Sequence, residues 1–261
     1  MLTFPHIDPI AFSLGPLTVR WYSLAYMVGI LGGWWLLGVI QKKFPLAHFD
    51  KRARDDLIFW AIIGIVLGGR LGYVLIYNPA YFIEHPLDAL QIWKGGMAFH
   101  GGLVGFIVAM YWFARRRGIH FLGLMDRMAC VAPLGLFAGR IANFINGELY
   151  GRVTESSLGM VFPDGGALPR HPSQLYQAGL EGIATGLILW LLLYRTQDSN
   201  SPGKLSGMFL VLYGIARMIG EAFREPDAHL GFLISGLTMG QLLSLPMIGI
   251  GMGMYVYSAR K

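Results

Sequence analysis

The stretch 139–152 passes from the end of an apolar run into a polar loop, and it carries side chains suited to binding an anion. Arg140, Asn143 and Gly147 are spaced by three and four residues, so they share one face of a helix. An arginine within a bilayer is costly and requires a functional or structural reason. The planar guanidinium group holds a phosphate through two parallel hydrogen bonds. This helix face therefore predicts a site for an anionic group.

A second polar face lies in the apolar run 205–223 and its continuation, and it consists of Tyr213, Arg217, Glu221 and Arg224. Glu221 follows Arg217 by four residues, so it could be an ion-pair partner that only makes the arginine tolerable. Arg70 is a third arginine within an apolar run. Against these three arginines we count two nearby acids, Glu148 and Glu221. Arginines that outnumber their acidic partners in a low-dielectric cavity predict an anionic ligand.

His100 is a candidate proton acceptor, because a neutral imidazole can take a proton from a nucleophile near ambient pH. It stands before a pair of glycines that open space beside it, and it is the only histidine within an apolar run. A lone histidine near a membrane interface is also often structural. Tyr22, at the start of the first apolar run, is either a hydrogen-bonding group of the site or an interfacial anchor.

The composition indicates the elements that must position these residues. The 261 residues are 54% hydrophobic and 14% charged, with 36 glycines and a mean hydropathy of +0.51. Because soluble domains carry roughly 25% charged residues, these values indicate a polytopic membrane protein. Seven segments are long and apolar enough to cross a bilayer: about 19–40, 57–77, 96–114, 124–144, 176–194, 205–223 and 235–257. We expect an all-α fold that forms one membrane-embedded domain, 1–261.

Glycines recur at every fourth residue in the second and third segments, at Gly64, Gly68 and Gly72 and at Gly101 and Gly105. Small residues at this spacing let helix backbones approach closely in membranes, so we expect these faces to serve packing. The single cysteine, Cys130, excludes an internal disulfide and is expected to be a buried packing residue. No histidine or acidic pair has a convincing metal spacing, so we expect no metal and no cofactor. The N-terminus lacks the pattern of a signal peptide.

Lysine and arginine are concentrated in alternate connections: the linker 41–56, residues 115–127, the flanks of the fifth-to-sixth connection and the C-terminus. Cytoplasmic loops carry such an excess, so we expect the N-terminus outside and the C-terminus in the cytoplasm. This orientation places the candidate residues in the outer half of the membrane. It also explains the net charge of +6 without a nucleic-acid partner. The outer connection, about 145–175, is long and rich in turn-forming residues, and we expect it to form an ordered cap.

Four motifs closely resemble those of the bacterial prolipoprotein diacylglyceryl transferases: HGGLVG (100–105), GRIANFINGE (139–148), HPSQLY (171–176), and Arg217 through Glu221 to Arg224, Glu225, Pro226 and Asp227. The resemblance extends to Arg20, Trp21 and Tyr22, with Ser23 and Tyr150 as conservative departures. It implies a seven-span enzyme of the inner membrane, with a periplasmic N-terminus, cap and active site. Such an enzyme moves the diacylglyceryl group of phosphatidylglycerol to the lipobox cysteine of prolipoproteins. A thioether forms and glycerol phosphate leaves, as the first step of lipoprotein maturation.

The resemblance also implies the site residues: Tyr22, His100, Arg140, Asn143, Glu148, Gly151, Tyr213, Arg217, Glu221 and Arg224. Our hypothesis assigns Arg140 and Arg217 to the phosphate, where charge develops as the C–O bond breaks. Asn143 and Glu148 position the glycerol, and Glu221 orients Arg217. His100 helps to deprotonate the incoming thiol, because the thiolate is the nucleophile.

Three other classes of membrane protein were weighed. A transporter of anionic solutes explains arginines within the membrane, but it calls for internal repeats and polar groups at mid-membrane, which this sequence lacks. A seven-span receptor or scaffold has no need of a positively charged cavity. An intramembrane protease calls for a serine or paired-aspartate site within the spans, and none stands out.

Overall fold

The computed structural model describes residues 2–196, 201–226, 233 and 236–260. Asp227 of the last motif and residue 235, the predicted start of the seventh segment, lie outside these residues. The chain divides into two compact units. The first unit comprises Met1–Val39 and Met125–Lys261, and the second comprises Ile40–Leu124.

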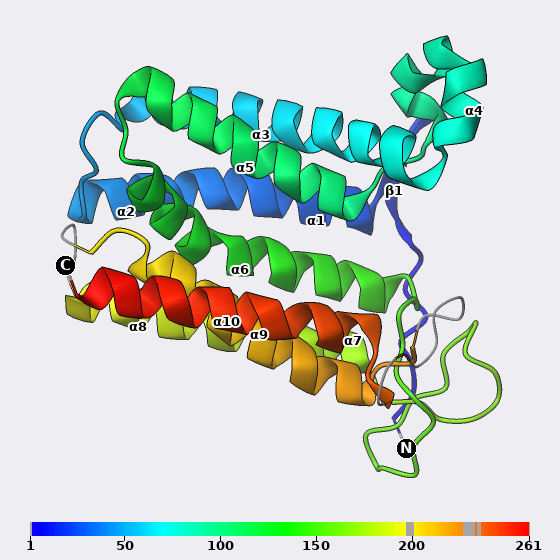
Figure 1. Cartoon of the computed structure of the whole chain (residues 1–261). Coiled ribbons are helices and arrows are strands. Elements are labelled where there is room, and N and C mark those ends of the chain that lie inside the picture. Colours follow the sequence, from blue (N-terminus) through cyan, green and yellow to red (C-terminus); the bar gives the residue numbers. More distant parts are fainter. Residues whose placement is uncertain (1, 197–200, 227–232, 234–235, 261) are drawn as a thin grey trace. The chain divides into compact units, whose positions relative to one another are not determined.

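The described residues are mostly helical (Figure 1). Near the N-terminus, β1 (Ile10–Leu14) pairs antiparallel with β2 (Leu17–Arg20). The helices that follow are α1 (Trp21–Met27), α2 (Gly33–Lys43), α3 (Lys51–Gly72), α4 (Pro79–Glu84), α5 (Phe99–Arg117), α6 (Phe121–Ile145), α7 (Ser173–Gln177), α8 (Thr185–Thr196), α9 (Lys204–Phe223) and α10 (Met239–Ala259). π-Helical segments join or extend several of them, at Val28–Gly32, Tyr73–Tyr77 and Ala178–Ala184. Each of the seven predicted segments is thus helical over most of its described part.

Within the described residues, six helical stretches are long and apolar enough to cross a membrane: Trp21–Lys43, Lys51–Tyr77, Phe121–Ile145, Ser173–Arg195, Lys204–Phe223 and Met239–Ala259. The third predicted segment, α5, is not among these six and carries three arginines in its last turn.

Local signals fix several helix ends. The Asp50 carboxylate accepts a hydrogen bond from the Ala53 amide at the start of α3, and α5 stops at Gly118 in the left-handed conformation.

In the second unit, α3 and α5 pack antiparallel through their glycine faces (Figure 1). A methyl group added at Gly68 would lie 2.7 Å from the Cα atom of Gly105, and one at Gly72 would lie 2.8 Å from the Cα atom of Gly101. The backbones therefore touch with no room for a side chain. The predicted use of these glycines for close helix packing is confirmed.

In the first unit, glycines likewise bring helices together. A methyl group at Gly207 would lie 2.7 Å from the carbonyl oxygen of Gly251, so α9 and α10 are closely packed, as Figure 1 shows. Gly182 meets the backbone of Phe137, which brings the segment Ala178–Ala184 against α6. Cys130 is 2% exposed on α6, which confirms the predicted buried packing role.

The segment 146–172 is ordered against the N-terminal residues of the first unit. Phe4, Phe144, Met160 and Phe162 form a buried cluster, with the rings of Phe4 and Phe162 5.0 Å apart. Isolated β-bridges pair Leu2 with Met160 and Met160 with Arg170. The long connection between α6 and α7 therefore packs against the N-terminal residues of the same unit.

Candidate active site

Two arginines from different helices of the first unit meet at one buried carboxylate. Arg140 of α6 donates from Nε to Oε2 of Glu181 at 3.0 Å and from Nη2 to Oε1 at 3.3 Å. Arg217 of α9 places Nη1 3.8 Å from the same Oε1 atom. Glu181 is 0% exposed and lies in the π-helical segment Ala178–Ala184. Single π-helical turns are frequent at functional sites.

A second carboxylate continues the cluster along α9. Glu221 forms an ion pair with Arg217 Nη2 at 2.7 Å and accepts from Arg224 Nη1 at 3.1 Å. Its other oxygen accepts from the Thr238 hydroxyl at 2.7 Å. Arg152 donates to the backbone carbonyl oxygens of Arg224 and Glu221. The expected pairing of Glu221 with Arg217 is confirmed. We call Arg140, Glu181, Arg217, Glu221 and Arg224 the arginine–glutamate cluster.

Asn143 and Glu148, predicted at the end of α6, contact each other. Asn143 donates from Nδ2 to Oε1 of Glu148 at 2.7 Å. The intervening turn needs Gly147 at φ 69°, a conformation that glycine adopts at little cost. The backbone carbonyl oxygen of Glu148 accepts from Gln174 Nε2 at 2.6 Å, so this turn is held against α7.

Gly151 marks the point where the segment 146–172 crosses the end of α9. A methyl group there would lie 2.5 Å from the carbonyl oxygen of Phe223 and 2.6 Å from that of His171. The His171 ring contacts the Tyr176 hydroxyl through Nδ1 at 3.3 Å, and partial burial lowers the pKa of His171 below its usual value. Gly151 therefore holds two backbones together next to Arg224.

Several buried polar atoms near the cluster have no hydrogen-bond partner in the described part of the protein. They are Arg217 Nη1, Asn146 Oδ1, Gln174 Oε1, and both Nε2 and Oε1 of Gln177. Gln174 and Gln177 are fully buried and precede Glu181 on the same helical run. Buried polar groups are nearly always hydrogen-bonded. Unsatisfied donors fit the oxygen atoms of an anionic ligand, and unsatisfied amide oxygens fit hydroxyl groups.

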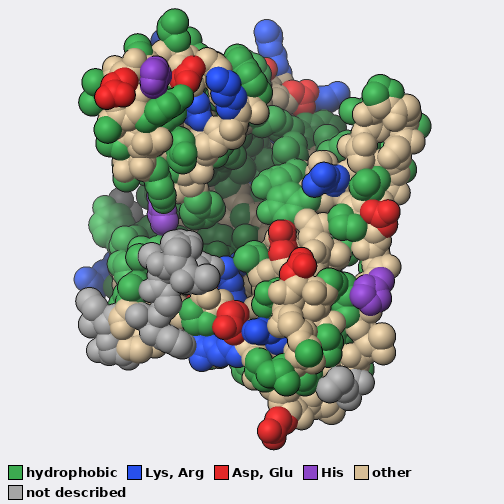
Figure 2. Space-filling view, turned by 90° about the vertical axis from the view of Figure 1, so that its right-hand side faces the viewer, with side chains coloured by type: hydrophobic (Ala, Val, Ile, Leu, Met, Phe, Trp, Pro, Cys, Tyr) green, Lys and Arg blue, Asp and Glu red, His purple; other side chains and the backbone are tan. Residues whose placement is uncertain are grey.

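Charged side chains also reach the surface at one end of the first unit. Figure 2 shows basic and acidic side chains next to one another among polar and apolar ones.

Three further predicted residues make other contacts, and Tyr213 among them interacts electrostatically with Glu181, Arg217, Arg140 and Glu221. Tyr213 is on α9 with its ring stacked on Phe209, one turn before Arg217. Tyr22 is on α1, where its ring lies 5.2 Å from that of Tyr26. His100 is exposed in the first turn of α5, in the second unit, with its ring 5.6 Å from that of Phe99. The roles of Tyr22 and His100 in chemistry stay predictions.

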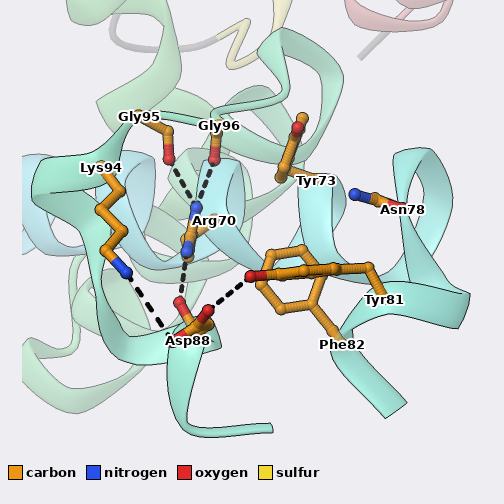
Figure 3. A pocket seen from close by; sticks show the side chains of 9 residues that line it. All are labelled: Arg70, Tyr73, Asn78, Tyr81, Phe82, Asp88, Lys94, Gly95 and Gly96. Atoms are coloured by element: carbon orange, nitrogen blue, oxygen red, sulfur yellow. Dashed lines mark hydrogen bonds and ion pairs between the residues drawn. The ribbon is translucent and has the colours of Figure 1, made fainter. Parts of the chain in front are cut away.

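Arg70 differs from the expectation that it adds free positive charge to an anion site. It is 7% exposed, and its guanidinium group donates to the backbone carbonyl oxygens of Asp88, Ala89, Gly95 and Gly96. Figure 3 shows Arg70 between Asp88 and the two glycines. It borders a cavity of about 150 Å³ in the second unit, also lined by Tyr81 and Lys94. The Tyr81 hydroxyl donates to Asp88 at 2.5 Å and holds the pKa of this carboxyl below its usual value. Arg70 therefore holds the segment 78–98 in place.

Glu181 is the residue that the sequence analysis missed. The sequence did contain a signal, because an acid within the predicted segment 176–194 is as costly in a membrane as Arg140. Its presence reduces the excess of arginines over acids that the sequence indicated. Among the described residues, no group of three or more histidine, cysteine or acidic side chains is placed to hold a metal ion.

The fold is that of a multi-pass membrane protein, and its first unit carries a buried cluster of arginine and glutamate side chains. A family model described as prolipoprotein diacylglyceryl transferase matches residues 9–257. The chain belongs to the prolipoprotein diacylglyceryl transferase family, and the resemblance noted from its motifs is confirmed.

Three relatives match nearly the whole chain. A protein of Paramagnetospirillum magneticum is 51% identical over 261 residues, which are 100% of this chain and 97% of the relative. One of Rhodospirillum rubrum is 52% identical over 260 residues, 99% of this chain and 95% of the relative. One of Rickettsia felis is 52% identical over 250 residues, 96% of each. All three are named phosphatidylglycerol–prolipoprotein diacylglyceryl transferase. The chain is thus an enzyme of the transferase class.

Proposed function

We propose that the chain transfers the diacylglyceryl group of phosphatidylglycerol to the lipobox cysteine of prolipoproteins, the first step of lipoprotein maturation. Relatives that bear the name of this activity match nearly the full chain. The observation that carries the site assignment is the buried pair Arg140 and Arg217, which meet at Glu181. Among the described residues, Arg217 Nη1 has no hydrogen-bond partner. A phosphodiester supplies the oxygen atoms that such donors bind.

The reaction is a displacement at carbon. The thiolate sulfur of the acceptor cysteine attacks the glyceryl carbon that is bonded to the phosphate oxygen, so a C–S bond forms as the C–O bond breaks. The electron pair of the C–O bond leaves with the oxygen, and the released group is glycerol phosphate. The thiol proton passes to a base. Negative charge therefore grows on the phosphate, where arginine donors stabilise it most in the transition state.

The residues take the following roles in this proposal. Arg140 and Arg217 hold the phosphate, and Glu221 fixes Arg217. Asn143 and Glu148, which are hydrogen-bonded to each other, position the glycerol of the headgroup. Tyr213 and Arg224 complete the headgroup site, and Gly151 keeps the segment 146–172 close to the end of α9. His100 accepts the thiol proton, with Tyr22 as a further hydrogen-bonding group. No cofactor takes part.

We further propose that α5, the third predicted segment along the chain, also crosses the membrane, which brings the number of spans to seven. It packs antiparallel along α3, which is long and apolar enough to cross a membrane, and their glycine faces meet over several turns. With seven spans, the distribution of lysine and arginine puts the N-terminus in the periplasm and the C-terminus in the cytoplasm. The segment 145–175 is then a periplasmic cap, and the site faces the periplasmic side of the inner membrane.

The proposed activity is tested with purified protein in detergent, phosphatidylglycerol labelled in its diacylglyceryl group, and a lipobox peptide. We expect label on a peptide with cysteine at the acceptor position and none on the same peptide with serine, because a hydroxyl is far less acidic than a thiol. Absence of product with the cysteine peptide contradicts the proposed function.

The phosphate role predicts that Arg140→Ala and Arg217→Ala each lose transfer, even with saturating phosphatidylglycerol. Removing one donor from a site that stabilises developing charge lowers kcat by about 10²- to 10³-fold. Arg195→Ala is a matched control, because Arg195 is exposed on α8, the helix that continues the run carrying Glu181. If either variant keeps the full rate while folded, that arginine has a structural role only.

A further inference from the structure

Glu181 places a negative charge where the proposed substrate is itself an anion. Its carboxylate is 0% exposed, accepts two hydrogen bonds from Arg140 and lies 3.8 Å from Arg217 Nη1. Gly182 permits this position, because a methyl group there would lie 2.9 Å from the Cα atom of Phe137. A site shaped only for tight anion binding gains nothing from this charge. The carboxylate therefore calls for a reason beyond phosphate affinity.

The charge of the ligand changes during the proposed reaction. A phosphodiester carries one negative charge, whereas a phosphomonoester carries close to two at neutral pH, because its second pKa is about 6. The cluster holds three arginines and two glutamates. Arginines without Glu181 attract the leaving monoester more than the incoming diester, since the attraction grows with ligand charge. Such a site retains its product.

We propose that Glu181 is a specificity-determining residue that lowers the charge of the Arg140–Arg217 pair, so that the site favours a phosphodiester monoanion over a phosphomonoester dianion. The inference rests on the proposed function, because the two ligands are its substrate and its product. Glu181 also fixes the position of both guanidinium groups. The effect of the charge can be separated from this positioning role by Glu181→Gln. A glutamine keeps the shape of the side chain and an acceptor for Arg140 but carries no charge.

The test measures binding of two water-soluble ligands, glycerol phosphate and glycerophosphoglycerol, to wild type and to Glu181→Gln by calorimetry in detergent. At about pH 7.5 we expect the affinity for the monoester, relative to the diester, to rise about tenfold in the variant. At about pH 5 the monoester has lost its second charge, so we expect this relative gain to disappear. In transfer assays, added glycerol phosphate should inhibit the variant more strongly than wild type.

Glu155→Gln is the matched control, because it removes the same charge from an exposed position in the segment 146–172. Glu181→Asp keeps the charge on a shorter side chain, so we expect it to keep the ligand preference of wild type even where its turnover falls. Where Glu181→Gln does not fold, Glu181→Ala removes the same charge and takes its place in the binding test.

An unchanged ratio of the two affinities in folded Glu181→Gln overturns the inference, as does a change of equal size at both pH values. An Asp variant that shifts the ratio toward the monoester also overturns it. Failure of the proposed function has a different signature, since wild type then transfers no diacylglyceryl group to the cysteine peptide.

Discussion

At the scale of single residues, the proposed chemistry needs cationic groups that stabilise the leaving phosphate and a base that takes the thiol proton. These two kinds of residue lie in different parts of the sequence. The arginine–glutamate cluster belongs to the first unit, where each guanidinium group is fixed by a carboxylate. Fixed donors need no rearrangement as negative charge grows on the leaving phosphate, which is the source of their catalytic effect. The proton acceptor is proposed to be His100 of the second unit.

His100→Gln tests this assignment. General-base catalysis contributes about 10²- to 10⁴-fold, so we expect turnover to fall by that order. The loss should shrink as pH rises toward the ordinary pKa of a thiol, about 8.5, because a thiolate then forms without the base. Assays of label transfer across pH measure both effects. His85→Gln is the control, since His85 is exposed in the segment before α5. Near-normal turnover of folded His100→Gln leaves the arginines as the activators of the thiol.

Spacing along the sequence predicted which residues share a helix face, but not which faces meet. Arg140 with Asn143, and Arg217 with Glu221, follow directly from helical periodicity. The meeting of Arg140 with Glu181 depends on a π-helical turn, whose extra residue breaks that periodicity. The contacts of Arg70 were not predictable either, because its partners are backbone carbonyl oxygens. Every residue type carries such an oxygen, so the sequence does not show which ones an arginine will bind.

At the scale of elements, apolar length predicted the helices to within a few residues at most ends. The excursion between α3 and α5 was not predicted in detail. It contains α4 and two short 3₁₀ turns, Pro86–Leu90 and Ile92–Lys94, which are too short to show a periodic pattern. Pro79 begins α4, and Pro86 begins the first of the two 3₁₀ turns. Contacts of Arg70, rather than local propensity, hold the excursion against α3.

The glycine face between α3 and α5 gives a prediction with an internal control. A methyl group at Gly105 would lie 2.7 Å from the Cα atom of Gly68, whereas one at Gly102 would lie 3.4 Å from the Ile65 carbonyl oxygen, an ordinary contact. Overpacking a close interface costs about 1–3 kcal/mol. We therefore expect Gly105→Ala to lower the unfolding temperature in detergent clearly and Gly102→Ala to change it little. Equal effects of the two substitutions contradict the close backbone contact.

At the scale of the whole molecule, composition and the distribution of basic residues indicated a membrane class and an orientation. The class follows from six long apolar helices and from family membership. The side of the membrane is a separate matter, because apolar length is the same in either orientation. Only the lysines and arginines of the connections distinguish the two orientations. The basic connections all lie on one side of the membrane only if α5 also crosses it.

The status of α5 gives the last prediction. Its 19 residues reach about 28 Å as a helix, close to the thickness of the hydrocarbon core of about 30 Å. Its partner α3 is long and apolar enough to span, and the two pack antiparallel, so both should cross at the same depth. Lys94 and Arg116 are exposed near opposite ends of α5. We therefore expect them on opposite sides of the membrane.

Cysteine labelling measures this directly, because native Cys130 is buried and should react little. A membrane-impermeant maleimide added to the periplasmic side should label Lys94→Cys and Ser156→Cys. It should label Arg116→Cys and Lys51→Cys only after the membrane is opened. Labelling of Lys94→Cys and Arg116→Cys from the same side leaves six spans. The alternation of basic connections then no longer places the arginine–glutamate cluster in the periplasmic half, where a secreted cysteine could meet it.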